Sequence, residues 1–122
     1  MCLYIVKSPS NYFEPVTLEK HEIIAENEEY YKLEHSVEVT ESYYSREIAK
    51  SFIDGASTVF VVLHNSISAW FTFSEDKAVE IANAQRLTHI VEGRAVIRSL
   101  RKAIKKMEDH PFTIEGEKEN EE

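Results

Sequence analysis

The chain has 122 residues, is 43% hydrophobic and carries a formal net charge of −8. This length predicts a single domain, residues 1–122, and the negative charge disfavours duplex nucleic acid as a partner. The single cysteine, Cys2, excludes an internal disulfide and a cysteine-based zinc cluster. Because no long apolar run or leader peptide is evident, we expect a cytoplasmic protein that does not enter a membrane.

The first 73 residues are predicted to be rich in strands. Residues 3–7 form a short apolar run that ends in a cluster of turn formers. Residues 21–25 and 30–34 flank the polar segment 26–29, which predicts a hairpin with an acidic tip. Residues 36–40 are expected to continue the sheet.

The segment from Ser42 to Ile53 is ambiguous between a helix and a strand. Tyr44, Ile48 and Phe52 are spaced four residues apart and fit one face of a helix. We expect a short helix here.

Residues 57–63 and 67–73 predict a second hairpin. The first run is apolar on both faces, so we expect a central strand that is covered on both sides. The second run places Ala69 and Phe71 on one face and Trp70 on the other.

A long helix is predicted over residues 75 to about 107, with Ser74 as its N-cap, followed by an acidic tail over residues 113–122. Ile90, Ile97 and Ile104 recur every seven residues, and Leu100 and Met107 occupy the complementary heptad positions. The heptads predict a homo-oligomer, a dimer or higher, that forms through this helix. The fold class is therefore α+β, a small antiparallel sheet followed by a long C-terminal helix.

Residues 93–107 carry six cations and no anion, within an otherwise acidic chain. At 100° per residue, four of them fall within about 60° on the helix and form what we call the basic stripe: Arg94, Arg98, Arg101 and Lys105. One explanation is structural, because cations in the last turns of a helix are favoured by its dipole and the acidic remainder could lie opposite them. The other is functional: arginine forks match phosphate and carboxylate, so the basic stripe would receive a phosphorylated ligand or an acidic partner protein.

Catalytic chemistry has little support in the sequence. The five histidines show no metal-ligand spacing, and no phosphate loop, nucleophile elbow or activated cysteine is present. We therefore expect neither an enzyme nor a bound metal or cofactor.

Asn83 lies eleven residues before Arg94, so it falls on the same helical face as the basic stripe. An aromatic strand end at Phe73, a capped helix, an early asparagine and later arginines resemble the phage anti-Thoeris proteins that sequester cyclic ADP-ribose signals. The resemblance covers roughly residues 67–107. It implies a viral sponge protein that binds its nucleotide without converting it. Phe73 would stack on a base, Asn83 would hydrogen-bond, and Arg94, Arg98 or Arg101 would meet the pyrophosphate.

Two other functions remain open at this point. An acidic protein-binding inhibitor or nucleic-acid mimic would use residues 14–41 and the acidic tail, and the basic stripe would then be structural. A nucleic-acid binder would use the basic stripe with Trp70 as the stacking ring, although the overall charge disfavours it.

Overall fold

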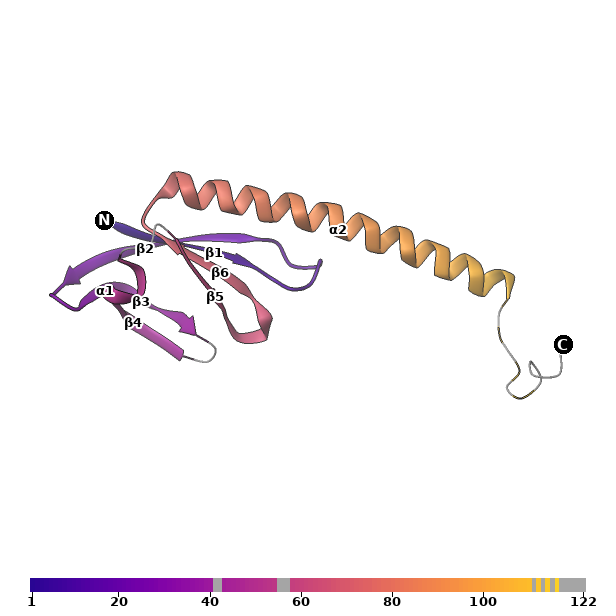
Figure 1. Cartoon of the computed structure of the whole chain (residues 1–122), viewed down its shortest axis with the longest axis horizontal. Coiled ribbons are helices and arrows are strands. Elements are labelled where there is room, and N and C mark those ends of the chain that lie inside the picture. The colour runs from indigo at the N-terminus through magenta and orange to yellow at the C-terminus, as the bar shows by residue number, and fades with distance from the viewer. Residues whose placement is uncertain (41–42, 55–57, 111, 113, 115, 117–122) are drawn as a thin grey trace. The chain divides into compact units, whose positions relative to one another are not determined.

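A computed structural model describes residues 1–40, 43–54, 58–110, 112, 114 and 116. It contains a six-stranded antiparallel sheet and a long C-terminal helix, which confirms the predicted α+β class (Figure 1). By its internal contacts the chain divides into two compact units, Met1–His89 and Ile90–Glu122. The long helix begins in the first unit and ends in the second.

The strands are ordered β4-β3-β2-β1-β6-β5 in the sheet. Their bounds are β1 Cys2–Ser8, β2 Thr17–Glu26, β3 Tyr30–Thr40, β4 Tyr43–Ala49, β5 Val59–Val62 and β6 Ser68–Thr72. The other elements are α1 Lys50–Ile53, the 3-10 turn η1 His64–Ser66 and α2 Glu75–Asp109. Both predicted hairpins, β2–β3 and β5–β6, are confirmed.

Alternating side chains of β1 divide the core of the first unit into two layers. Leu3 and Ile5 belong to a larger cluster, whereas Tyr4 and Val6 belong to a smaller one on the other face of the sheet. All four are buried. The central strand β1 is therefore covered on both sides.

The sheet curls around the larger cluster. β3 changes register against both of its neighbours, and such bulges bend a strand and increase its twist. Val37 and Val39, in the second half of β3, and Ile53 of α1 join this cluster. β3 also contacts β5, which lies at the far end of the strand order, so the sheet closes part of the way into a barrel.

The first turns of α2 cover the smaller cluster. Ala78 is buried there, and Ile81 and Ala82 pack beside it. Ser74 Oγ accepts a hydrogen bond from the backbone N–H of Lys77 at 3.2 Å, which confirms the predicted N-cap. Further along α2, Nε2 of His89 lies 3.1 Å from Oγ of Ser8, so a side-chain hydrogen bond joins β1 to α2.

The helix expected over residues 42–53 is wrong for most of its length. Residues 43–49 form strand β4, which pairs with β3, and only α1 is helical; Ser42 lies outside the described residues. Tyr44 and Ile48, four residues apart, satisfy both a helical and a strand period. The edge of β3 offers backbone hydrogen bonds that decide in favour of the strand.

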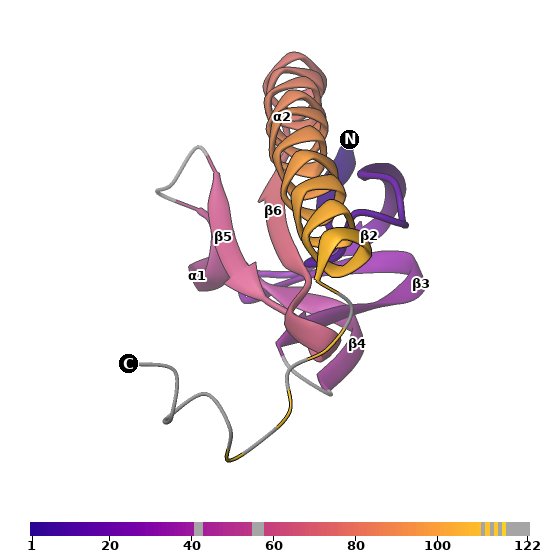
Figure 2. The same ribbon diagram turned by 90° about the vertical axis from the view of Figure 1, so that its right-hand side faces the viewer.

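The expectation that the apolar run of residues 59–63 forms a central, covered strand is also wrong. β5 is an edge strand with β6 as its only ladder partner among the described strands (Figure 2), and Phe60 and Val62 are each 53% exposed. The sequence shows an apolar run but not which strand takes the place beside β1, and that strand is β6. The predicted division of β6 is confirmed, with Ala69 and Phe71 on one face and Trp70 on the other.

The predicted acidic tail, residues 113–122, lies outside the described residues except for Ile114 and Gly116. Neither described helix has the length and apolar character needed to cross a membrane.

Candidate anion-binding helix

The second half of α2 presents nearly all of its side chains to solvent. From residue 90 to residue 110, Ile90 and Gly93 are half-buried and the others are exposed. Within the unit that begins at Ile90, the described side chains therefore provide little cover for this helix.

Large apolar side chains are exposed along one side of this segment. The exposed fractions are 40% for Val96, 48% for Ile97, 56% for Leu100, 51% for Ile104 and 58% for Met107. At 100° per residue these five lie within an arc of about 100°, with Gly93 near its middle, and we call this set the apolar face. On protein surfaces in general, large contiguous apolar patches often belong to interaction sites.

The basic stripe lies immediately beside the apolar face. Arg101 is about 40° from Ile97 around the helix axis, so the two surfaces meet along one edge. Within the described part of the chain, none of the four cations of the stripe forms an ion pair. Cations four residues apart repel each other by roughly 0.2–0.5 kcal/mol per pair, and a bound anion would relieve this cost.

Phe73 and Asn83, the other two residues predicted to bind ligand, belong to the first unit. Phe73 follows β6 and is half-buried against the larger cluster, with its ring centroid 5.2 Å from that of Tyr31 in an edge-to-face arrangement. Asn83 is exposed on α2. The three arginines belong to the second unit, so the structure does not bring the five predicted residues together in one described site.

Trp70, the alternative stacking ring, is half-buried and packs against Phe60 with centroids 5.1 Å apart. Because Phe60 is more than half exposed, this pair forms an aromatic patch at the β5 edge.

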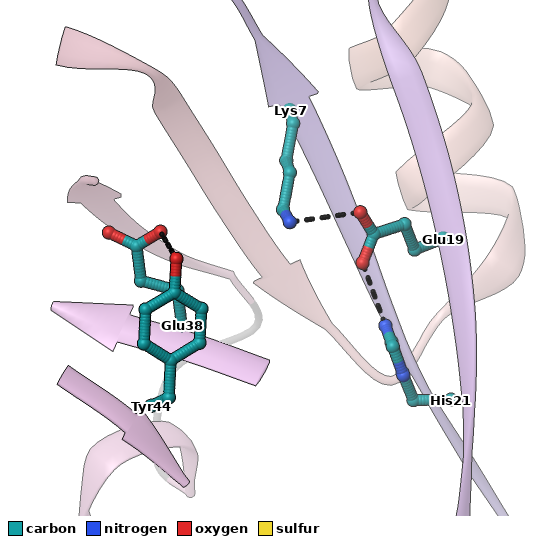
Figure 3. A network of polar contacts seen from close by, with 5 residues as sticks. All are labelled: Lys7, Glu19, His21, Glu38 and Tyr44. Atoms are coloured by element: carbon teal, nitrogen blue, oxygen red, sulfur yellow. Dashed lines mark hydrogen bonds and ion pairs between the residues drawn. The ribbon is translucent and has the colours of Figure 1, made fainter. Parts of the chain in front are cut away.

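Sequence reasoning missed a charged group on the sheet, drawn in Figure 3. By register, its members share the sheet face of Leu3 and Ile5, which belong to the larger cluster. The Glu19 carboxylate binds Nζ of Lys7 at 2.9 Å and Nε2 of His21 at 2.8 Å. Burial raises the pKa of Glu19, but the hydrogen bonds from Lys7 and His21 outweigh it and hold that pKa below its ordinary value. The spacing of Glu19 and His21 by two residues is the signal in the sequence, because it puts both on one face of β2, but only the strand register brings in Lys7.

A second missed group joins distant parts of the sheet. Glu38 is buried, and its Oε1 accepts a hydrogen bond from the Tyr44 hydroxyl at 3.1 Å (Figure 3). Its Oε2 accepts the backbone N–H of His64 at 2.6 Å. The hydrogen bond to Glu38 and the charge of Glu38 raise the pKa of Tyr44. Both carboxylate oxygens are thus used within the fold, and this group is structural.

Among the described residues, no group of three or more histidine, cysteine, aspartate or glutamate side chains is arranged to hold a metal ion. Comparisons with models of protein families, with curated proteins and with solved structures found no match.

Proposed function

We propose that the protein binds and sequesters a phosphorylated small molecule without converting it, as a homo-oligomer that forms through α2. The observation that carries this proposal is the exposed basic stripe directly beside an exposed apolar face. The apolar face supports self-association, and the stripe supports anion binding.

Arginine chemistry favours a phosphate as the anion. Arg94, Arg98 and Arg101 each offer a planar fork of donors, which binds phosphate or carboxylate through two parallel hydrogen bonds. Each charge-assisted hydrogen bond contributes roughly 1.5–3 kcal/mol. Three forks within one short arc fit a compact, multiply charged group such as a pyrophosphate.

The ligand class follows from the resemblance to the anti-Thoeris sponge proteins. A cyclic ADP-ribose-type nucleotide combines a pyrophosphate for the basic stripe with a base for an aromatic ring. Phe73 is the proposed stacking ring and Asn83 the proposed hydrogen-bonding amide of one copy, and both face arginines of the basic stripe of another copy. The protein would then act for a phage against a host defence signal in the host cytoplasm.

Calorimetry tests the proposal with cyclic ADP-ribose isomers, linear ADP-ribose and inorganic pyrophosphate as separate ligands. We expect binding by the unmutated protein and at least a tenfold loss of affinity in Arg98→Gln, because one charge-assisted contact is removed. Arg86→Gln is the matched control, an exposed arginine of α2 outside the stripe. Chromatography of the released ligand should show it intact. The absence of binding to every nucleotide and to pyrophosphate would refute the proposal.

One observation favours the alternative of an acidic inhibitor that binds a protein. Glu28 and Glu29 are exposed at the tip of the β2–β3 hairpin, where Asn27 Oδ1 accepts the backbone N–H groups of Glu29 and Tyr30 and fixes the turn. Replacing both glutamates with lysine separates the two functions. Under our proposal nucleotide binding survives this change, whereas an inhibitor that uses this tip would lose its target.

A further inference from the structure

The heptad positions of the second half of α2 distinguish two ways of pairing two copies. Ile90, Ile97 and Ile104 occupy one core position, and Gly93, Leu100 and Met107 occupy the other. In a parallel pair each residue faces its own counterpart. Gly93 would then face the partner's Gly93, and the core would contain a gap, which costs free energy in proportion to its volume.

In an antiparallel pair, residues of the first core position face residues of the second. Placing Ile97 opposite the partner's Leu100 also places Gly93 opposite the partner's Ile104, and Ile90 opposite the partner's Met107. Every core residue from Ile90 to Met107 then faces a core residue of the partner helix, and none extends past the end of the contact. Gly93 meets a bulky side chain instead of another glycine, so this register fits the sequence better than the parallel one.

The two flanks of the antiparallel core differ in chemistry. On one flank Val96 faces the partner's Ala103, which extends the apolar contact. On the other flank Arg94 lies next to the partner's Arg101. Twofold symmetry also places Arg101 next to the partner's Arg94, so the pair contains two such sites. A parallel pair would instead set Arg101 against the partner's Val96, and no cations would gather.

Because the contact between the two helices is small, the stability of an antiparallel pair depends on the interaction between these arginines. A contact about 27 Å long and about 10 Å wide covers only a few hundred Å² per copy, the lower end for specific association. Repulsion between the arginines subtracts from this small gain. An anion held between the two arginine forks would replace that repulsion with charge-assisted hydrogen bonds.

We infer that two copies of the chain pair their α2 helices antiparallel, and that Arg94 of one copy and Arg101 of the other form a seat for a phosphate or pyrophosphate group that is absent from the monomer. This inference rests on the proposed function, because it names where and how the basic stripe takes its anion. Anion binding and pairing then promote each other, since the anion binds the pair and not the single chain.

Cysteine cross-linking tests the orientation, in a Cys2→Ser background under mild oxidation. An equimolar mixture of Ile97→Cys chains and Leu100→Cys chains should form a disulfide-linked dimer with one copy of each, because these two positions face each other in the antiparallel register. The single variant Ile97→Cys should not, because Ile97 faces its own counterpart only in a parallel pair. Efficient cross-linking of the single variant would overturn the antiparallel arrangement.

Sedimentation equilibrium with and without inorganic pyrophosphate tests the seat. We expect saturating pyrophosphate to lower the dimer dissociation constant about tenfold or more. Arg94→Gln/Arg101→Gln should pair more tightly without the anion and should not respond to it. The control Lys102→Gln/Lys106→Gln removes two cations from the same helix away from the seat and should still respond.

The outcomes separate this inference from the proposed function. If the unmutated protein binds a nucleotide but pyrophosphate leaves its dimerisation unchanged, or if the monomeric variant Ile97→Glu binds equally well, the inference fails and the proposed function stands. If the mixed Ile97→Cys and Leu100→Cys chains cross-link but no phosphorylated compound binds, the proposed function fails, and the anion seat fails with it.

Discussion

The carboxylate of Glu38 and the backbone N–H of His64 lie 2.6 Å apart although 26 residues separate them in the chain. Glu38 is on β3 and His64 begins the turn that follows β5, so this hydrogen bond spans the two parts of the sheet that curl toward each other. The Tyr44 hydroxyl holds the other oxygen of the same carboxylate. One buried side chain thus fixes how far the sheet closes.

Removing this carboxylate should destabilise the fold. Glu38→Ala removes the acceptor of the His64 N–H, and a hydrogen bond to a charged group contributes roughly 1.5–3 kcal/mol. We expect a fall of this size in the free energy of unfolding, measured in urea. Glu34→Ala, at an exposed position of the same strand, is the control and should change it by less than about 0.5 kcal/mol. Equal effects of the two variants would contradict a closing role for Glu38.

Acid should weaken the fold through Glu19. The pKa of Glu19 is lower in the folded protein than its ordinary value of 4.5. A carboxylate with a depressed folded pKa contributes stability above its unfolded pKa, and this contribution is lost as the pH falls through the folded pKa. The free energy of unfolding should therefore fall below about pH 4.5, and less steeply in Glu19→Gln. Urea unfolding from pH 6 to pH 3 measures both slopes, and parallel curves would contradict the assignment.

The turn between β5 and β6 contains a strained residue. Asn65 and Ser66 have φ angles of 60° and 59°, in the left-handed region. Asparagine tolerates this conformation. For serine the left-handed conformation costs roughly 1–2 kcal/mol of folding free energy, whereas for glycine it carries no such cost. Glycine also loses more backbone entropy on folding than serine does, which offsets part of this gain. Ser66→Gly should therefore raise the free energy of unfolding by up to about 1 kcal/mol. Ser51→Gly, within α1, should destabilise it, and thermal unfolding of the two variants should shift in opposite directions.

Periodicity was enough to predict most of the fold. The apolar run of residues 3–7, the alternation in residues 67–73 and the helical period of α2 are local properties, and each of these three elements formed where its pattern indicated. The place of β5 at the edge depends on which strand lies beside β1, a long-range choice that no local pattern contains. The segment with Tyr44 and Ile48 was ambiguous between helix and strand for the same reason. Its strand conformation depends on pairing with β3, which is a long-range contact.

In the candidate site, too, the local features could be predicted from the sequence and the long-range contacts could not. The basic stripe and the heptad positions Ile97, Leu100, Ile104 and Met107 follow from helix arithmetic alone, and the structure leaves both sets exposed. The contact of Phe73 with Tyr31 could not be foreseen, because these residues meet only through the fold. The Lys7–Glu19 ion pair was hidden for the same reason, since it depends on the register of β1 against β2.

A charge in the apolar face should prevent self-association of the chain. Ile97→Glu places a charge at the centre of that face, where pairing would bury it without a partner, so the oligomer should dissociate. Ser99→Glu adds the same charge to the next turn of the helix, about 160° away from Ile97 around the axis, and should leave the oligomer intact. Light scattering at tens of micromolar should therefore give a multiple of the chain mass of 14.1 kDa for the unmutated protein and for Ser99→Glu, and a single chain mass for Ile97→Glu. Circular dichroism should show the same helix content in all three, because the exposed face does not hold the first unit together. An unmutated protein that stays monomeric even with saturating pyrophosphate, or an Ile97→Glu variant of unchanged mass, would show that this face does not join the copies.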